Sequence, residues 1–263
     1  MPSAVVNGRA FYWREAGSGP PVILLMGLET DHRGWFRLVP HLAPWFHCIS
    51  PDNRDVGRSG FASAAYERAA LAEDTLGLMD QLGIESAAFI GQSMGGAVAQ
   101  VIARRAPERV KRLVLISSFA ALEERSKSLL SQWKTLRRAL SLRDYYAGAF
   151  LWMYTRSEYD TSGLIETLLQ RATANPAPQP YDAFCRQVDA VLRFDSRPWL
   201  RELSVETLIV SGDEDLVTPP ANAHELAASI PKSGLLMVEQ SGHGLVLTGA
   251  INAVGADICQ FLM

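Results

Sequence analysis

The sequence is poor in cysteine, has no excess of basic residues and contains no long hydrophobic run. Its three cysteines, Cys48, Cys185 and Cys259, are odd in number and widely spaced, so they match neither a disulfide framework nor a zinc pattern. We therefore expect a reducing compartment, the cytoplasm. No apolar run reaches the roughly 18 residues that a membrane span needs, and the first ten residues lack a signal-peptide pattern.

Charge is equally unremarkable, with 25 Lys and Arg against 28 Asp and Glu, a formal net charge of -3. Nucleic-acid binding usually needs a basic excess or stripe, so no nucleic-acid partner is expected. One basic run, Lys134, Arg137 and Arg138, has helical spacing and is interpreted as a solvated helix face. The sequence contains no metal-ligand cluster, no P-loop and no dinucleotide fingerprint, so we expect neither a metal nor a cofactor.

What is present is an alternation of strand and helix patterns over a chain of 263 residues, 48% of them hydrophobic. A hairpin is predicted first, with its turn at Asn7-Gly8. Short apolar runs then predict strands, and segments of helical spacing lie between them. The strands are expected at 22–26, 46–49, 87–90, 110–116, 207–210 and 235–238, and the helices at 35–45, 66–82, 94–106, 221–230 and 251–261. This order predicts an α/β fold with a doubly wound, mostly parallel sheet.

The alternation stops between residues 121 and 198. That segment shows only helical patterns and one irregular stretch, and it is rich in aromatic residues. We expect one α/β core, residues 1–120 and 199–263, with 121–198 inserted as a helical cap over a site. The alternative is a set of extra packed helices without a special role.

The strongest local signal is Gly91-Gln92-Ser93-Met94-Gly95-Gly96, which lies between a predicted strand and a predicted helix. Such a turn lifts a serine hydroxyl clear of the sheet, where a base can reach it. Small residues are needed beside it because a Cβ would clash with the neighbouring strand and helix. Ser93 is therefore the candidate nucleophile.

A nucleophilic serine needs a base and an acid that orients the base. His243 stands between two glycines in a loop that follows a predicted strand, and it is the candidate base. Asp215 is the candidate acid because the apolar turn after it would hold it against the sheet edge. Asp213, in the same loop, is the alternative acid. His32 is considered as a residue that borders the site, whereas His224 is expected to face solvent.

The order Ser93, Asp215, His243, together with the serine turn and the helical insertion, resembles the α/β-hydrolase family over essentially the whole chain. The loop 52–59 is also similar to a loop of that family, with Asp55 in place of the usual glycine. The resemblance implies an oxyanion hole formed by the backbone N–H groups of Met94 and Leu28. Here Met26-Gly27 replaces the family's usual His-Gly. Glu29 is unusual beside this loop, because its charge would oppose an oxyanion unless it points away.

These features predict a serine hydrolase that cleaves a small carboxylic ester, thioester or lactone through an acyl-enzyme. Phe119, Trp152 and Val217 are candidate pocket residues, and the aromatic cap favours an apolar or aromatic acyl substrate. Two alternatives on the same residues stay open: a cofactor-free perhydrolase (haloperoxidase) and a C–C bond hydrolase. A third alternative is a ligand-binding receptor on a hydrolase scaffold. The sequence leaves open whether the chain forms a homo-oligomer.

Overall fold

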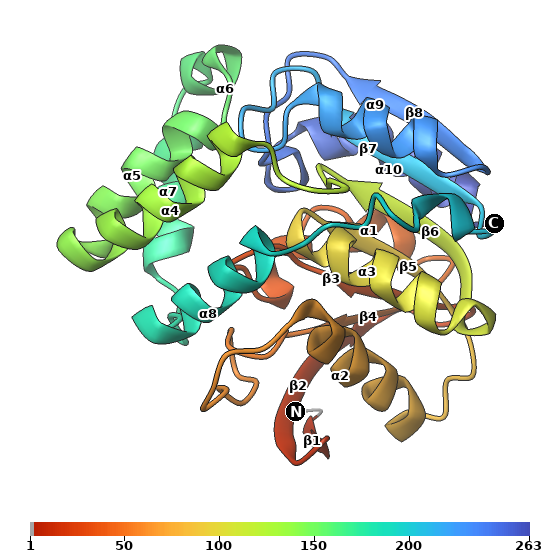
Figure 1. Ribbon diagram of the computed structural model, residues 1–263. Helices are drawn as coiled ribbons and strands as arrows, with labels where there is room; N and C mark the ends of the chain where they lie inside the picture. The colour runs from red at the N-terminus through yellow and green to blue at the C-terminus, as the bar shows by residue number, and fades with distance from the viewer. Residues whose placement is uncertain (1–2) are drawn as a thin grey trace.

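The computed structural model describes residues 3–263 and confirms the predicted α/β fold class (Figure 1). Eight strands form one sheet in the order β1-β2-β4-β3-β5-β6-β7-β8. β1 and β2 form the antiparallel hairpin at one edge, and β3 to β8 pair in parallel. The strands are β1 Ser3–Val6, β2 Arg9–Ala16, β3 Pro21–Leu25, β4 His47–Pro51, β5 Ala87–Gln92, β6 Val110–Ile116, β7 Thr207–Gly212 and β8 Ser233–Val238.

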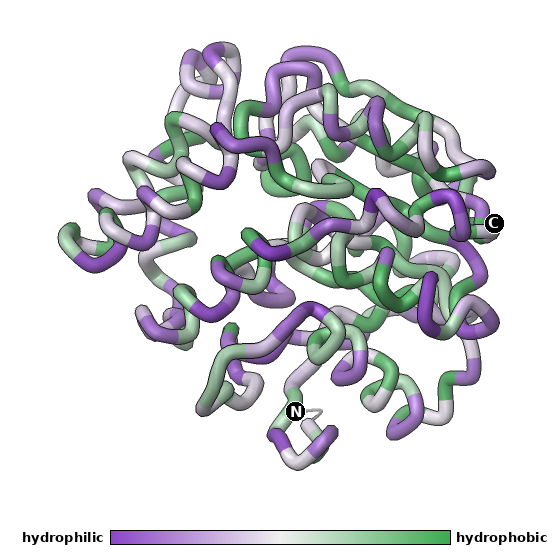
Figure 2. The backbone as a smooth tube through the Cα atoms, in the orientation of Figure 1, coloured by the Kyte–Doolittle hydropathy of each residue, from purple (hydrophilic) through white to green (hydrophobic). Residues whose placement is uncertain are grey.

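The central strands are buried on both faces, as their unbroken apolar runs predict. In β3, Ile23 and Leu25 belong to the hydrophobic core on one face of the sheet. Val22 and Leu24 belong to the core on the other face. Figure 2 shows the hydrophobic positions gathered in the interior, along the strands and the helices beside them.

Helices cover both faces of the sheet. α2, α3 and α9 contribute buried residues to the core on one face, and α1 and α10 to the core on the other. Their bounds are α1 Val39–Leu42, α2 Arg68–Gln81, α3 Met94–Arg105, α9 Pro220–Ser229 and α10 Ala250–Leu262.

The helix predicted at 35–45 is wrong in its extent. The structure has a 3-10 turn at His32–Trp35 and a single helical turn, α1, that begins at Val39. Pro40 explains the break, because proline has no N–H to donate and its ring clashes with the carbonyl of the preceding turn.

Between β6 and β7 the chain forms helices only, and Figure 1 shows α4 to α7 grouped to one side of the sheet. An isolated bridge between Ala121 and Asp195 joins the two ends of this segment. We call residues 121–198 the helical segment. Its helices are α4 Glu124–Ala139, α5 Leu142–Met153, α6 Arg156–Asp160, α7 Leu164–Thr173 and α8 Tyr181–Leu192.

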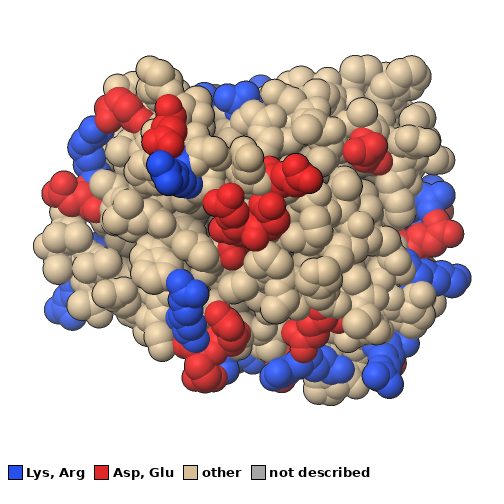
Figure 3. All heavy atoms as spheres, turned by 90° about the horizontal axis from the view of Figure 1, so that it is seen from above, with Lys and Arg blue, Asp and Glu red and all other residues tan. Residues whose placement is uncertain are grey.

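On the face drawn in Figure 3, residues of both charge signs are scattered, with a small acidic group near the centre. Within residues 3–263, no helix combines the length and apolarity needed to cross a membrane.

Candidate active site

Ser93 occupies the sharp turn between β5 and α3. Its backbone has φ 51° and ψ −117°, a conformation that L-residues rarely adopt. A Cβ on Gly95 would overlap with the Leu25 carbonyl of β3, and a Cβ on Gly91 would meet the backbone of Gly95 at 2.5 Å. The glycines beside the serine are therefore required by the close approach of strand and helix.

The structure brings the three candidate side chains together at the carboxyl ends of β5, β7 and β8. Ser93 Oγ lies 3.1 Å from His243 Nε2, and His243 Nδ1 lies 2.8 Å from Asp215 Oδ2. All three residues are buried, with Asp215 only 1% exposed. This is the geometry in which a histidine can accept the serine proton while a carboxylate fixes its tautomer.

Asp215 is held by its own turn. The backbone N–H groups of Val217 and Thr218 both donate to Asp215 Oδ1 at 2.8 Å. Thr218 Oγ1 lies 2.9 Å from Asp215 Oδ2 and 3.1 Å from His243 Nδ1. Asp213, the alternative acid, instead accepts from the Ser241 N–H at 3.3 Å. Sequence reasoning missed Thr218 as a polar neighbour of the site, although its place three residues after Asp215 is the signal for such a turn.

The glycines that flank His243 serve close packing against the helical segment. A Cβ on Gly242 would overlap with the Met153 carbonyl at the end of α5, and one on Gly244 would overlap with the Tyr154 ring. The Gly244 N–H also donates to the Met153 carbonyl at 3.0 Å. The histidine loop is thus fixed by the helical segment, and the two glycines are needed for this close packing.

Two backbone amides are available near the serine. Leu28 follows β3 in the loop beside β5, and Met94 is the first residue of α3. In the part of the chain that the structure describes, neither amide donates to another protein group. Both residues line the same cavity as Ser93 and His243. Free N–H groups beside a nucleophile are the donors that an oxyanion needs.

That cavity has a volume of about 380 Å³ and lies between the sheet edge and the helical segment. Phe119 and Val217 line it, as predicted. Trp152 does not: its ring lies under the Arg125 guanidinium, 5.2 Å from the ring centroid. The aromatic lining that the sequence did not single out comes chiefly from α4, α5 and the turn after α5, namely Trp133, Tyr145, Tyr146, Phe150 and Tyr154.

The basic run on α4 is not a solvated face throughout. Arg137 is only 10% exposed at its side chain, and its Nε donates to Glu29 Oε1 at 3.0 Å. Lys134 pairs with Asp189 at 2.7 Å. Helical spacing identifies residues that share a helix face, but it does not indicate the carboxylate of Glu29 that this face meets.

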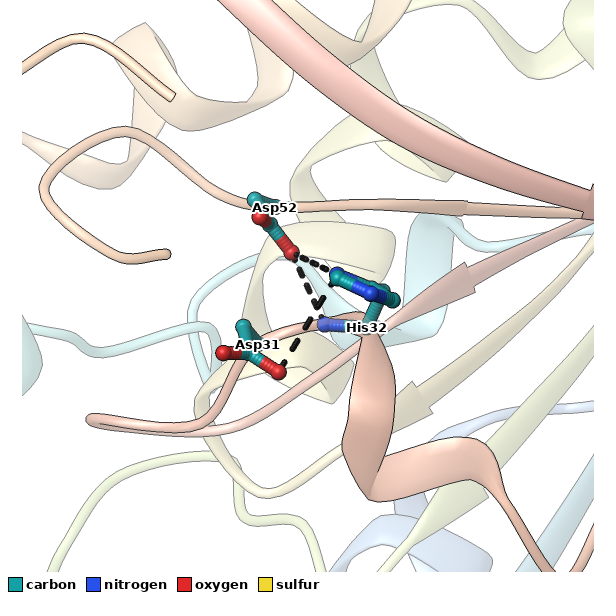
Figure 4. Close-up of side chains that lie close together, drawn as sticks. All are labelled: Asp31, His32 and Asp52. Carbon is teal, nitrogen blue, oxygen red and sulfur yellow. Dashed lines mark hydrogen bonds and ion pairs between the residues drawn. The ribbon is translucent and has the colours of Figure 1, made fainter. Parts of the chain in front are cut away.

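His32 does not line the cavity, although Asp31 and Arg33 on either side of it do. It belongs to a group with Asp31 and Asp52, shown in Figure 4. One ligand atom from each of the three lies within 4.8 Å of the others, close enough to suggest a cation site. However, Asp52 Oδ1 already accepts from the His32 N–H at 2.9 Å and lies 2.7 Å from His32 Nδ1. Asp52 Oδ2 accepts from the Arg58 N–H at 2.9 Å, and Asp31 binds the Arg33 guanidinium. We interpret the group as an internal link between two loops. His224, in contrast, is exposed on α9 as predicted.

Comparisons with known proteins agree with this architecture. The family model described as "alpha/beta hydrolase fold" matches residues 20–250. A 2-hydroxymuconate semialdehyde hydrolase from a Pseudomonas species is 31% identical, covering 87% of this chain and 82% of that protein. A non-heme haloperoxidase from Rhodococcus erythropolis is 26% identical, covering 97% of each chain. The crystal structure of an enol-lactonase from Burkholderia xenovorans superposes with a TM-score of 0.89 at 26% identity, over 99% of both chains. The chain belongs to the α/β-hydrolase fold family.

Proposed function

We propose that the protein is a serine hydrolase that cleaves a small carboxylic ester, thioester or lactone through an acyl-enzyme. The observation that carries this proposal is the continuous contact from Ser93 Oγ through His243 to Asp215, at 3.1 and 2.8 Å, beside a cavity that Ser93 and His243 line. A serine without such a base is a weak nucleophile.

The reaction follows from this geometry. Ser93 Oγ attacks the substrate carbonyl carbon while His243 Nε2 takes the hydroxyl proton. The Leu28 and Met94 amides donate to the oxygen that becomes negative. As the tetrahedral intermediate collapses, the bond to the leaving group breaks, and the leaving group takes the proton from His243. Water then attacks the acyl-enzyme, gives its proton to His243 and releases the carboxylic acid, and Ser93 regains its proton.

The cavity suits a small apolar or aromatic acyl group. Cavities that hold small ligands are mostly lined by hydrophobic and aromatic side chains with a few polar groups. Here Ser93 and aromatic rings from the helical segment line one cavity of about 380 Å³. We propose that residues 121–198 act as a cap, with residues 1–120 and 199–263 as the core, and that the cap selects the substrate.

Similarity to other enzymes suggests alternative reactions for the same site. Similarity to a 2-hydroxymuconate semialdehyde hydrolase makes C–C bond hydrolysis the second candidate. Faster turnover of 2-hydroxymuconate semialdehyde than of any ester would favour C–C bond hydrolysis. Similarity to a non-heme haloperoxidase makes perhydrolysis a further alternative, marked by peroxide-dependent halogenation. A receptor would bind a ligand tightly without turnover, and Ser93→Ala would leave its function intact.

A panel of chromogenic esters of graded acyl length, thioesters and lactones tests the proposal. Wild-type protein should hydrolyse at least one class, with Ser93→Ala and His243→Ala about 10³-fold slower or worse. His224→Ala is the matched control, because this histidine is exposed on α9, and it should stay within about twofold of wild type. Activity retained in Ser93→Ala would rule out the proposed nucleophile.

A further inference from the structure

A buried carboxylate lies one residue after the proposed oxyanion donor Leu28. The Glu29 side chain is only 10% exposed and lines the cavity. A negative charge at this place would oppose an oxyanion unless other groups neutralise and direct it. The contacts of Glu29 therefore decide whether it hinders the site or supports it.

Three groups of the helical segment hold the carboxylate. Glu29 Oε1 accepts from Arg137 Nε and from the Tyr146 hydroxyl, each at 3.0 Å. Oε2 accepts from the Tyr145 hydroxyl, also at 3.0 Å. Arg137 supplies the opposite charge, and it is fixed in turn by donating to the Gln179 carbonyl at 3.0 Å. The charge of Glu29 is thus directed toward α4 and α5.

The backbone of the same residue is fixed as well. Glu29 has φ 63°, in the left-handed region, which costs a residue other than glycine free energy unless contacts enforce it. Its N–H donates to Gln187 Oε1 on α8 at 3.1 Å. Gln187 is fully buried, and its Nε2 donates to the Arg54 carbonyl of the core at 3.0 Å. Contacts from α4, α5 and α8 therefore converge on one residue.

We propose that Glu29 is a positioning residue that sets the Leu28 amide in the oxyanion hole, so that the arrangement of the helical segment controls transition-state binding. The proposal rests on the proposed serine hydrolase function. The Leu28–Glu29 peptide unit carries the Glu29 N–H that Gln187 holds, and the donor N–H of Leu28 lies one peptide unit earlier in the same loop. A twist of the Glu29 backbone therefore shifts the segment that carries the donor. Misplacement of one donor lowers the rate without removing the ground-state contacts of the substrate.

The principal variant is Glu29→Gln, which keeps the size of the side chain but leaves Arg137 without its counter-charge. We expect kcat to fall about tenfold or more on the best ester, with KM within about threefold of wild type. The affinity for a trifluoromethyl ketone analogue, which forms a tetrahedral adduct with an oxyanion, should fall in parallel. The affinity for the matching ether, which has no carbonyl, should not change.

The matched control is Glu166→Gln. Glu166 also pairs with an arginine of the helical segment, Arg143, at 2.6 Å, but both side chains are about half exposed and neither lines the cavity. We expect wild-type kinetics from this variant. The double variant Tyr145→Phe/Tyr146→Phe removes only the two hydroxyl donors and should lower kcat at least threefold. If Glu29→Gln does not fold, this double variant still tests whether Glu29 and its partners position the Leu28 amide.

The outcomes separate the two proposals. If folded Glu29→Gln and the double tyrosine variant keep kcat and analogue affinity within twofold of wild type, Glu29 does not position the donor, even if the melting temperature falls. In that case Ser93 would still react with a fluorophosphonate in the wild type, and the serine mechanism would stand. If the wild type neither reacts with the fluorophosphonate nor hydrolyses any substrate of the panel, the proposed function fails and this inference fails with it.

Discussion

Asp55 and Arg186 form a bidentate ion pair that joins the loop after β4 to helix α8. Arg186 Nε lies 2.8 Å from Asp55 Oδ2, and Nη2 lies 2.9 Å from Oδ1. Asp55 is fully buried and has φ 69°, in the left-handed region. Glycine adopts such a φ without strain, whereas an aspartate needs contacts that hold it there. The ion pair thus holds this backbone conformation and links the core to the helical segment.

This pair predicts unequal effects from its two partners. Arg186→Met leaves a buried carboxylate without its counter-charge and should lower the free energy of unfolding by about 3–5 kcal/mol. Asp55→Gly should cost less, because Arg186 is 19% exposed and can reach water, and because glycine tolerates the backbone conformation. Urea unfolding of both variants and of the double variant checks this. A larger loss in Asp55→Gly than in Arg186→Met would contradict it.

The two aspartates of the loop after β7 should differ sharply in their effect on activity. Asp215→Asn replaces the carboxylate that contacts His243, and we expect kcat to fall about 10³–10⁴-fold, because the histidine would be held in the wrong tautomer. Asp213→Asn changes a carboxylate that accepts from the Ser241 N–H at 3.3 Å, and this variant should stay within about threefold of wild type. Steady-state kinetics on one ester decides between them. The reverse order would make Asp213 the acid.

The pH dependence of stability should contain a contribution from Glu29. Burial raises the pKa of the Glu29 carboxyl above its ordinary value of 4.5, although Arg137 and the hydroxyls of Tyr145 and Tyr146 act in the opposite direction. Between 4.5 and the raised pKa the folded state binds a proton that the unfolded state has lost. The free energy of unfolding therefore falls as pH rises through this window.

The comparison of wild type with Glu29→Gln isolates this contribution, because the other titrating groups cancel in the difference. We expect wild type to be most stable relative to Glu29→Gln below pH 4.5 and to lose that advantage as the pH rises through the raised pKa. Urea unfolding from pH 4 to pH 8 measures it. A difference that grows with rising pH would show that the folded protein lowers the pKa of Glu29.

Cys48 should be inert toward thiol reagents while the protein is folded. Burial raises the pKa of the Cys48 thiol to about 11, and its exposed fraction is 1%. Since the thiolate is the reactive form, almost none is available at pH 8. Cys185 is partly exposed and should react first with a chromogenic disulfide reagent. Cys185→Ser should remove the fast phase, and a fast phase that remains would contradict this.

The meeting of Ser93, Asp215 and His243 was predictable because each of these residues lies in a turn or loop directly after a strand. The carboxyl ends of parallel strands meet at one edge of a sheet, so three local patterns indicate one site. The strand positions were predictable for a similar reason, since short apolar runs such as the one in β3 identify strands that are buried on both faces.

Contacts between distant segments were not predictable. Arg137 meets Glu29 across 108 positions of the chain, and no local pattern indicates that pairing. Trp152 shows the same limit, because an aromatic residue in a core helix and one in a cavity wall leave the same signal in the sequence. Glu29 was noticed only as a charge in an unexpected place. Its partners Arg137, Tyr145 and Tyr146 can be identified only from the structure, in which α4 and α5 pack against the loop after β3.

A fluorophosphonate probe followed by intact-protein mass measurement shows whether Ser93 is the nucleophile. We expect one adduct per wild-type chain, with peptide mapping placing it on Ser93, and no adduct on folded Ser93→Ala. An adduct of equal stoichiometry on Ser93→Ala would show that Ser93 is not the nucleophile.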